Sequence, residues 1–363
     1  MRILQIANGY VENKLYSLLF TALEKQGVEQ TVFVPVNVKK APASQQNVHI
    51  VPCFDQLDRA LFFRKQKKIL RWLEGNLDIR SFDCIHAHTV FSGGYAAYQL
   101  HKKYGIPYIV AVRNTDVNLF FKYMVHLRKT GVEILKNAEK VIFLSPSYQE
   151  KVLADCVPLK ELETIAGKSM VIPNGIAQLF FDQNAAPRKL GTNLRLVYVG
   201  DINANKNVEL TIQAAELLRS QGHHVTLTAI GSIKDEAYRE TLNKDWITHH
   251  DRCPQSEVIE YLKDADIFVM PSHRETFGLV YAEAMSQGLP VLYTAGQGFD
   301  GHFPEGAVGY SVSDTDAAFL AEKILKIAEN YETLSKNAIQ NARRFDWNAI
   351  AAVYQSIYQE IQP

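Results

Sequence analysis

Short apolar runs alternate with longer segments of helical periodicity along the first half of the chain. The apolar runs have the length of buried strands and are bounded by polar or turn residues. Between the first two runs, apolar residues from Leu15 to Leu23 recur at the spacing of one helix face, and Gly27 is placed to end that helix. The predicted strands are Ile3–Ala7, Gln30–Val36, Asp83–His88, Tyr108–Val112 and Lys140–Ser145. Such alternation predicts a parallel sheet with helices on both faces.

The segment Val171-Ile-Pro-Asn-Gly175 interrupts this alternation with a turn, and the same pattern then restarts. Its predicted strands are Leu194–Gly200, Val225–Gly231, Ile267–Met270 and Pro290–Thr294, and its predicted helices are Val208–Arg219, Ser256–Asp264 and Gly278–Gln287. We therefore expect an α/β protein of two Rossmann-like, doubly wound domains, residues 1–170 and 171–345, that face each other across a cleft. A C-terminal helix, residues 346–363 with Asp346 as its N-cap, is expected to pack back toward the first domain.

Length and composition agree with a two-domain globular protein. The chain has 363 residues, of which 47% are hydrophobic and 21% charged, and these values exclude a disordered, collagen-like or coiled-coil protein. No stretch approaches the roughly 18 apolar residues of a membrane-spanning helix. The start, MRILQIANGY, predicts a buried strand and a turn rather than a signal peptide. The four cysteines form no CxxC pair, so we expect reduced thiols in a cytoplasmic protein.

The segment PSHRETFGLVYAEAMSQGLPVL, residues 271–292, combines a strand end, a loop and a helix start. Gly278 allows a ligand to approach the backbone, and the amides from Phe277 to Leu279, together with the helix dipole, suit a phosphate. Glu275 precedes the helix and Glu283 lies inside it, so one carboxylate can sit near each end of a phosphorylated ligand. The alternative is an ordinary strand, loop and helix with two surface glutamates.

A second candidate lies in YVGDINANKN, residues 198–207, where a strand ends at Gly200 and a polar loop leads to Lys206. A lysine at this position can neutralise a diphosphate as a point charge, or it can be a solvated lysine at a helix start. Asp201 in the same loop is acidic and does not favour an anion. Gly9 follows the first strand, so its backbone can approach the same ligand.

His86 and His88 end a predicted strand and lie on one face of it. His88 is predicted to contact donor or acceptor, and the alternative is one packed and one hydrogen-bonded histidine. Two Asp-x-Asp pairs, Asp264 with Asp266 and Asp314 with Asp316, have the spacing of metal-dependent transferases, but we expect them to serve turns and predict no essential metal. No Gly-x-Gly-x-x-Gly follows a strand, which argues against a nicotinamide dehydrogenase.

Together these segments resemble the family-four retaining glycosyltransferases of GT-B architecture, over nearly the whole chain. The most specific part is the Glu-x7-Glu element from Glu275 to Glu283. The supporting parts are Val-Ile-Pro-Asn-Gly-Ile176, Val-Gly200 with Lys206, Ala-Asp-Ile-Phe-Val-Met-Pro-Ser272 and Gly288-Leu-Pro-Val291.

The resemblance implies roles for individual residues. Lys206 is expected to bind the donor diphosphate, Glu283 the ribose hydroxyls and Glu275 the donor sugar. The donor-binding set is Gly9, Gly200, Lys206, Arg274, Glu275, Thr276, Phe277, Gly278, Leu279 and Glu283, and the catalytic set is Lys206, Glu275, His88 and Arg113. Two positions depart from the family: Asp201 stands where an arginine is usual, and Arg113 stands where a histidine is frequent.

Charge is distributed unevenly along the neutral chain. Residues 1–170 hold 23 basic and 15 acidic residues, a net charge of +8, and the remainder carries −8. Basic and aromatic residues interleave in RALFFRKQKKILRW, residues 59–72, and in LFFKYMVHLRK, residues 119–129. These segments suit an anionic membrane surface, or they are solvated helix faces with buried aromatic rings. No nucleic-acid-binding motif is present.

The resulting hypothesis is a retaining, metal-independent, hexosyltransferase-type enzyme without a cofactor. It moves a sugar from a nucleotide diphosphate, expected to be UDP-linked from family frequency, to a glycan or lipid-linked acceptor in cell-surface polysaccharide or glycolipid synthesis. The expected location is the cytoplasm, with peripheral attachment to the inner face of the membrane. The alternatives are a nucleotide-sugar 2-epimerase of the same fold and a two-domain sugar-binding module.

Overall fold

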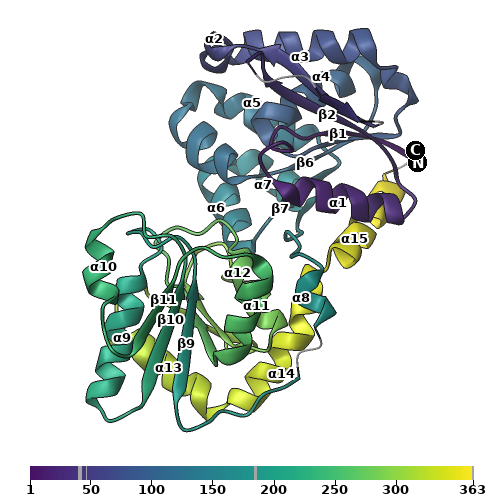
Figure 1. The fold of residues 1–363 in the computed structure, drawn as a ribbon. Coiled ribbons are helices and arrows are strands. Elements are labelled where there is room, and N and C mark those ends of the chain that lie inside the picture. The colour runs from purple at the N-terminus through teal and green to yellow at the C-terminus, as the bar shows by residue number, and fades with distance from the viewer. Residues whose placement is uncertain (40–42, 46, 184–185, 362–363) are drawn as a thin grey trace. The chain divides into compact units, whose positions relative to one another are not determined.

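A computed structural model describes residues 1–39, 43–45, 47–183 and 186–361 of the chain (Figure 1). The chain divides into two compact units. Unit 1 comprises residues 1–144, 148–173 and 347–363, and unit 2 comprises residues 145–147 and 174–346. The C-terminal segment therefore belongs to the same unit as the N-terminus.

Unit 1 is built on one sheet with the strand order β3-β4-β2-β1-β5-β6-β7-β8. Its strands are β1 (Arg2–Ile6), β2 (Glu29–Asn37), β3 (Ala43–Gln45), β4 (Val48–Phe54), β5 (Cys84–Ala87), β6 (Tyr108–Ala111), β7 (Lys140–Phe143) and β8 (Ser169–Val171). Neighbouring strands are parallel except that β3 runs antiparallel to β4 at the edge. The carboxyl ends of β1, β2 and β4 consequently meet at one end of the sheet.

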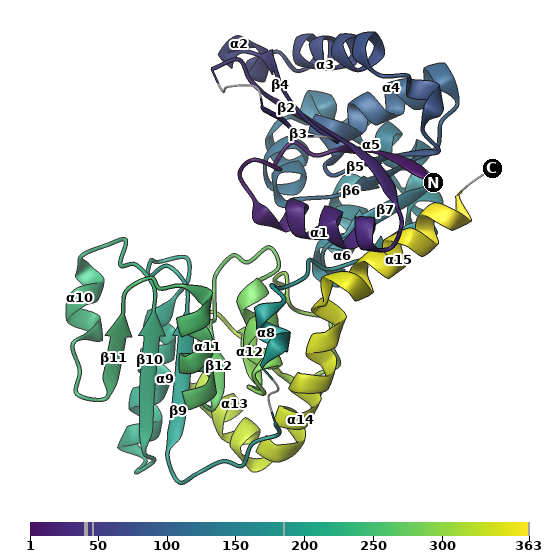
Figure 2. The same cartoon turned by 45° about the vertical axis from the view of Figure 1, so that its right-hand side comes forward.

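Helices cover both faces of this sheet, as the alternating side chains of β1 illustrate. Leu4 and Ile6 enter the cluster formed with α3 (Phe62–Asn76), α4 (Tyr95–Tyr104) and α5 (Arg128–Asn137), whereas Ile3 enters the cluster formed with α1 (Lys14–Lys25) and α15 (Trp347–Glu360). In Figure 2, α3 and α4 lie on one side of this sheet and α1 and α15 on the other. The helices associated with unit 1 are α1 (Lys14–Lys25), α2 (Gln56–Ala60), α3 (Phe62–Asn76), α4 (Tyr95–Tyr104), α5 (Arg128–Asn137), α6 (Pro146–Cys156), α7 (Leu159–Ala166) and α15 (Trp347–Glu360). Short helical turns span Ile79–Ser81, Val90–Gly94, Asp116–Phe121 and Val125–Leu127.

Unit 2 is built on a parallel sheet with the strand order β11-β10-β9-β12-β13-β14. Its strands are β9 (Leu194–Val199), β10 (Val225–Ile230), β11 (Ile247–His250), β12 (Ile267–Val269), β13 (Val291–Thr294) and β14 (Gly309–Val312). Its helices are α8 (Leu179–Asp182), α9 (Val208–Ser220), α10 (Ala237–Leu242), α11 (Gln255–Asp264), α12 (Leu279–Ser286), α13 (Ala317–Glu329) and α14 (Tyr331–Ala342), followed by a turn at Arg343–Phe345. The order reverses at β9, and such a switch point is where doubly wound sheets bind ligands.

The structure confirms two Rossmann-like sheets and most of the predicted elements. Gly27, which was expected to end a helix, has a left-handed backbone with φ of 78°, and Gly105 ends α4 in the same conformation with φ of 76°. Strands β3, β4, β8, β11 and β14 had not been predicted, and the antiparallel β3 corrects the expectation of a purely parallel first sheet. The four cysteines are free. Across the described residues, we find no helix with the length and apolar character needed to span a membrane.

Candidate functional site

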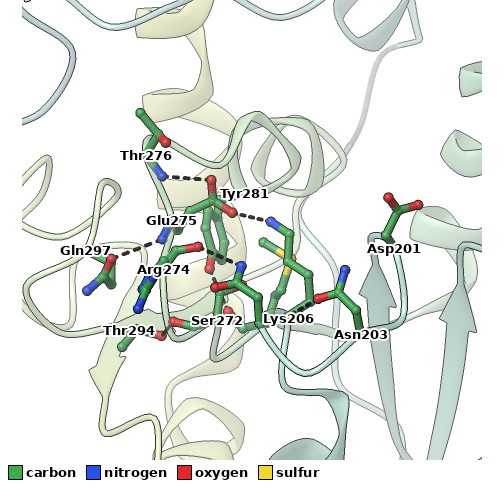
Figure 3. A network of polar contacts seen from close by, with 12 residues as sticks. Asp201, Asn203, Lys206, Ser272, Arg274, Glu275, Thr276, Tyr281, Thr294 and Gln297 are labelled. Carbon is green, nitrogen blue, oxygen red and sulfur yellow. Dashed lines mark hydrogen bonds and ion pairs between the residues drawn. The ribbon is translucent and has the colours of Figure 1, made fainter. Parts of the chain in front are cut away.

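Two loops of unit 2 meet at the switch point of its sheet. One follows β9 and the other follows β12, and hydrogen bonds join them at several points (Figure 3). His273 donates its backbone amide to the carbonyl of Asn205 at 2.8 Å, and the Asn205 side chain donates to the carbonyl of Arg274 at 3.0 Å. Each loop therefore fixes the backbone of the other, which is the preorganisation that a binding site needs.

Lys206 and Glu275 form an ion pair between these loops. Lys206 Nζ donates to Glu275 Oε2 at 2.5 Å, and both side chains are largely removed from solvent. The other carboxylate oxygen of Glu275 accepts the amide of Thr276 at 3.0 Å, and the Glu275 amide donates to Gln297 at 3.0 Å. The structure thus brings together the two residues for which the sequence predicts diphosphate and sugar binding.

Asn207 holds the Lys206 turn in place, and the sequence analysis did not single it out. It is the one non-glycine residue of the described chain with a left-handed backbone, at φ 58°. Its side-chain amide donates to the carbonyl of Pro271 at 3.1 Å and to that of Asp314 at 2.8 Å. Asparagine tolerates this conformation better than other side chains, so an asparagine next to a helix start was an available signal.

Gly278 begins the helix α12 with a left-handed backbone, at φ 76°. A Cβ at this position would lie 2.4 Å from the ring of Tyr281, so only glycine fits. Gly298, which was not predicted, packs even more tightly, because its Cβ would lie 2.0 Å from the carbonyl oxygen of Thr276. The loop that carries Glu275 therefore requires glycine at two positions. The helix α12 begins directly after this loop, at Leu279, and its first-turn amides have no partner within the helix.

Glu283 lies on α12 and is 8% exposed. Burial raises the pKa of its carboxyl group to about 7, while a hydrogen bond from Gln255 at 3.2 Å favours the ionised form. Gln255 begins α11, so Glu283 is held from a different element than the pair of Lys206 and Glu275. Glu283 is not one of two surface glutamates, because its carboxyl group is almost fully buried.

The remaining predicted donor-site residues differ in their surroundings. Phe277 is buried against Phe299, His302 and Phe345, so its ring packs the core and only its backbone is a candidate for ligand contact. Arg274 is exposed. A Cβ on Gly200 would meet only ordinary contacts, whereas one on Gly231 would lie 1.9 Å from the carbonyl oxygen of Gly200. The close contact between the two backbones therefore requires glycine at position 231, which was not predicted, and not at position 200, which was.

Asp201, which replaces the arginine usual in the resembling family, lies apart from the pair of Lys206 and Glu275 (Figure 3). Its Oδ1 lies 3.6 Å from Nζ of Lys234, which follows β10. Lys234 thereby offsets the negative charge that Asp201 brings to this edge of the sheet.

The predicted site residues of unit 1 occupy its interior and edge. His88 is fully buried, its Nε2 donates a hydrogen bond to Gln5 Oε1 at 2.8 Å, and its ring contacts the rings of Tyr16 and Phe20. Burial holds its pKa well below the usual range, so it is neutral. This arrangement favours the packed, hydrogen-bonded alternative over the predicted contact of His88 with donor or acceptor.

Arg113 and Gly9 lie close to the same strand ends. Arg113 is half-buried, and its Nε donates to the carbonyl of His88 at 3.3 Å. A Cβ on Gly9 would lie 2.9 Å from the Tyr16 ring, so packing alone favours glycine there. His86 and His88 do share one face, as predicted, because their rings stack at 3.9 Å.

One aspartate of each Asp-x-Asp pair makes a structural contact. Asp266, 1% exposed, accepts the Arg195 guanidinium through both carboxylate oxygens, at 3.0 and 2.7 Å, beside the amino ends of β9 and β12. That is the end of the sheet opposite to Lys206. Asp316 caps α13 by accepting the Phe319 amide at 2.9 Å. Within the described ranges, no three His, Cys, Asp or Glu side chains gather as a metal site.

Comparison with known proteins decides the family. The description "Glycosyl transferases group 1" matches residues 181–345, and "Glycosyltransferase Family 4" matches residues 17–177. The chain belongs to glycosyltransferase family 4. The two matched ranges follow the two units, and the pair of Lys206 and Glu275 lies in the group 1 region.

The chain is similar to named glycosyltransferases and to solved structures of the same fold. A D-inositol 3-phosphate glycosyltransferase of Arthrobacter sp. (strain FB24) is 26% identical over 302 residues, covering 76% of this chain and 70% of the relative. The capsular polysaccharide biosynthesis glycosyltransferase CapM of Staphylococcus aureus is 28% identical over 252 residues, covering 67% and 65%. The structure of Anabaena HepE in complex with UDP-glucose superposes with a TM-score of 0.63 at 16% identity, covering 99% and 100%, and shares the fold.

Proposed function

We propose that this family 4 glycosyltransferase transfers a sugar, with retention at the anomeric carbon, from a UDP-linked donor to a glycan or lipid-linked acceptor. The observation that carries the donor assignment is the ion pair of Lys206 and Glu275 at the switch point of unit 2, beside the start of α12. The fold shared with HepE, whose structure contains UDP-glucose, supports a nucleotide-sugar donor. The relationship to CapM supports a role in cell-surface polysaccharide or glycolipid synthesis.

In this proposal, the donor diphosphate displaces the Glu275 carboxylate from Lys206. Negative charge grows on the diphosphate as its bond to the sugar breaks, and the ammonium of Lys206 stabilises that charge. The α12 amides that begin near Gly278 add partial positive charge at the same place. Glu275, once released, accepts hydrogen bonds from sugar hydroxyls. We name no protein nucleophile.

Glu283 and Arg113 complete the assignment. Glu283 accepts hydrogen bonds from the ribose hydroxyls when it is ionised, with Gln255 holding one carboxylate oxygen. Arg113, in unit 1, contributes positive charge on the acceptor side. The proposed mechanism requires no metal ion, because Lys206 and backbone amides neutralise the diphosphate.

The experiment compares UDP with uridine, because only UDP carries the diphosphate. Lys206→Ala is expected to weaken UDP binding about 10- to 150-fold, the range for a lost charge-assisted contact, and to leave uridine binding unchanged. Lys189→Ala is the matched control, since Lys189 is an exposed cation of the same unit. Isothermal titration calorimetry measures both ligands. An unchanged UDP affinity in folded Lys206→Ala overturns the donor site.

The two alternatives are separated from the proposal by products. A thermal-shift panel of nucleoside diphosphates identifies the base, and the matching nucleotide sugar is then incubated alone. A 2-epimerase converts that donor without an acceptor, and a binding module neither hydrolyses nor transfers it. A transferase yields a glycoside whose anomeric configuration, read by NMR, tests retention.

We further propose peripheral attachment to an anionic membrane at the cytoplasmic face through α3 and the segment 119–129. Two basic side chains of α3 already have partners within unit 1. Lys68 Nζ forms an ion pair with Asp58 at 2.5 Å, and Lys65 Nζ lies 4.2 Å from the centre of the Phe54 ring. Lys67 and Arg71 are exposed and four residues apart on α3. Changing both to serine is expected to reduce sedimentation with anionic liposomes at low salt, and retention of full binding contradicts the attachment.

A further inference from the structure

A buried carboxylate in unit 1 connects the loops that follow two neighbouring strands, β5 and β6. Asp116 begins the turn Asp116–Phe121 after β6 and is 1% exposed. Its Oδ2 accepts the amides of Val90 at 3.0 Å and Arg113 at 2.9 Å, and its Oδ1 accepts the amide of Phe91 at 3.1 Å. Val90 and Phe91 follow β5, whereas Arg113 follows β6. One side chain therefore holds both loops, and both of its oxygens are engaged.

The loop after β5 is helical from its first residue. Its turn, Val90–Gly94, continues directly into α4. The first amides of a helix have no partner within the helix, and the charge of a carboxylate suits the helix dipole at this end. Asp116 supplies that partner, and the Thr89 side chain accepts the amide of Gly93 at 2.9 Å. The protein's own carboxylate thus satisfies amides that would otherwise attract an external anion.

Asp116 also fixes both backbone groups of Arg113. The Arg113 amide donates to the Asp116 side chain, and the Arg113 carbonyl accepts the amides of Asp116 at 2.9 Å and Val117 at 3.2 Å. This reciprocal pairing over three residues has the form of a capping box. The side chain of Arg113 leaves this fixed backbone and donates from Nε to the carbonyl of His88 at 3.3 Å. The starting point of the Arg113 side chain is therefore set by Asp116.

The charge of Asp116 costs stability. Burial raises the pKa of its carboxyl group to about 6 from the ordinary value of 3.8, although its three amide donors and the Arg113 guanidinium lower it. At pH 7 and above, the ionised carboxylate therefore destabilises the fold relative to the unfolded chain. Asparagine avoids this cost but has one acceptor oxygen, so its NH₂ group would face a backbone amide. A costly charge of this kind is typical of a functional position.

We propose that Asp116 is a positioning residue for sugar transfer, which acts by holding the backbone of Arg113 in place. The proposal rests on the role of Arg113 in the proposed function and deepens it by naming the residue that supports it. Asp116 itself contacts neither donor nor acceptor, because it is buried and both of its oxygens accept backbone amides. Substitutions of Asp116 are therefore expected to change turnover only while Arg113 is present.

Two substitutions separate the hydrogen bonds of Asp116 from its charge. Turnover is measured at pH 8 as release of UDP from UDP-glucose, or from the nucleotide sugar that the thermal-shift panel selects. Asp116→Ala removes every acceptor and is expected to reduce turnover by about tenfold or more. Asp116→Asn keeps one oxygen for the Arg113 and Val90 amides and is expected to stay within about threefold of the wild type. Equal losses in both variants, or full turnover in Asp116→Ala, overturn the positioning role.

Arg113→Ala provides a readout that a merely structural role would not move. It is expected to reduce turnover, and adding Asp116→Ala to it is expected to lower the rate by less than about twofold further. A further loss as large as that in the wild-type background shows that Asp116 acts independently of Arg113, which overturns the proposal. Full turnover in Arg113→Ala alone contradicts the role of Arg113 in the proposed function, and the positioning role falls with it.

Amide hydrogen exchange of the full chain tests the position of Arg113 without a ligand. Protection of the Arg113 amide is expected to fall by about tenfold in Asp116→Ala and to be largely kept in Asp116→Asn. Unchanged protection in Asp116→Ala overturns the proposal. Where Asp116→Ala does not fold, Asp116→Ser replaces it, because the shorter side chain leaves room for a water molecule that satisfies the amides without fixing Arg113.

Asp58→Ala is the matched control. Asp58 is a fully buried carboxylate of the same unit, and it also accepts the amide of the residue three positions earlier, Asp55, at 2.8 Å. Its substitution is expected to reduce protection of the Asp55 amide and to leave turnover unchanged. If Asp58→Ala loses as much turnover as Asp116→Ala, the effect is general destabilisation and the positioning role is overturned.

UDP titration separates this proposal from the proposed function. Asp116→Ala is expected to bind UDP like the wild type, because Lys206 and Glu275 lie in unit 2. A wild type that neither binds UDP nor releases it from a donor refutes the proposed function, and amide exchange still decides whether Asp116 fixes Arg113. A wild type and an Asp116→Ala variant with equal turnover refute the positioning role and leave the transferase standing.

Discussion

Lys206 Nζ lies 2.5 Å from Glu275 Oε2, so the cation expected to bind a diphosphate is already neutralised by the carboxylate expected to bind the sugar. In the proposed function, the donor diphosphate replaces Glu275 at Lys206, and the donor sugar replaces Lys206 at Glu275. The proposal therefore describes donor binding as an exchange of partners.

Glu275→Gln tests this exchange. Without the competing carboxylate, Lys206 is expected to bind UDP about fivefold more tightly, which corresponds to an ion pair of about 1 kcal/mol. The transfer rate is expected to fall at least tenfold, because Glu275 is proposed to hold the donor sugar. Calorimetry gives the affinity and product formation gives the rate. Glu322→Gln is the control, since Glu322 is an exposed glutamate of the same unit that pairs with Lys323. Weaker UDP binding in Glu275→Gln contradicts the exchange.

Glu283 predicts a pH dependence of stability. Burial raises its pKa to about 7 from the ordinary value of 4.5, so the folded protein holds a proton there that the unfolded chain releases at lower pH. The free energy of unfolding therefore falls as pH rises from about 4.5 to 7, by about 3 kcal/mol in total. Glu283→Gln removes this loss, so it is expected to be more stable than the wild type at pH 8 and equally stable at pH 4. Urea unfolding at both values measures the difference.

The same carboxyl group is expected to control donor binding. Only the ionised form accepts two hydroxyl hydrogen bonds without supplying a proton, so UDP affinity of the wild type rises with pH up to about 7 and then levels off. The diphosphate itself ionises near pH 6, and this ionisation also changes UDP affinity. Because glutamine does not ionise, the pH profile of Glu283→Gln shows the effect of the diphosphate alone. If wild type and variant show the same pH profile of UDP affinity, Glu283 does not contact the ribose.

Most of the predicted strands contain three or more consecutive apolar residues. The segment VHIVPCF of β4 was missed because His49, Pro52 and Cys53 interrupt its pattern, and ITHH of β11 was missed because it is short and half polar. Both are strands only because a longer parallel neighbour pairs with them, β2 in one unit and β10 in the other. Such pairing is a property of the whole sheet and leaves no local periodicity.

The candidate site was predictable where one short segment carries it, and not where two segments meet. Lys206, Glu275 and Gly278 lie in segments with recognisable spacing. Asn207 and Gly298 were missed because their partners, Pro271 and Thr276, lie far away in the sequence. His88 ends a strand as predicted, but sequence position alone could not tell a strand end that faces solvent from one covered by Tyr16 and Phe20.

Asn207 is expected to act on the reaction through Lys206. Asn207→Gly keeps the left-handed backbone and loses two hydrogen bonds, at about 1–2 kcal/mol of unfolding free energy. Asn207→Ala loses the same bonds and adds about 1–2 kcal/mol of backbone strain. Both are expected to reduce the transfer rate, because Lys206 loses its fixed position, and only Asn207→Ala is expected to be markedly unstable. If Asn207→Gly transfers sugar at the wild-type rate, the two bonds do not position Lys206.

Tyr358 on α15 ties the C-terminal helix to the sheet of unit 1. Its hydroxyl group lies 2.6 Å from His86 Nδ1 and accepts from Gln5 at 3.4 Å, in a fully buried network. Tyr358→Phe leaves the buried His86 Nδ1 without this partner, whereas Gln5 still donates to Gln30, and it is expected to lower the free energy of unfolding by about 1–3 kcal/mol. Tyr123→Phe is the control, because Tyr123 is exposed. Equal unfolding midpoints for the two variants contradict a structural role of this hydroxyl.

Metal independence is tested together with the alternative role of Asp266. Its carboxylate accepts the Arg195 guanidinium and the Arg195 amide, the latter at 3.0 Å, and is almost fully buried. Asp266→Asn removes a buried carboxylate from an exposed guanidinium and leaves part of its buried hydrogen bonding unmatched, so it is expected to lower the free energy of unfolding by about 1–3 kcal/mol. UDP affinity of the folded variant is expected to match the wild type, since the pair lies at the opposite end of the sheet from Lys206.

EDTA is expected to leave the transfer rate of the wild type nearly unchanged. A rate that EDTA abolishes and that manganese or magnesium restores contradicts the metal-independent mechanism. A simultaneous loss of UDP binding in folded Asp266→Asn assigns the metal to the pair of Asp264 and Asp266.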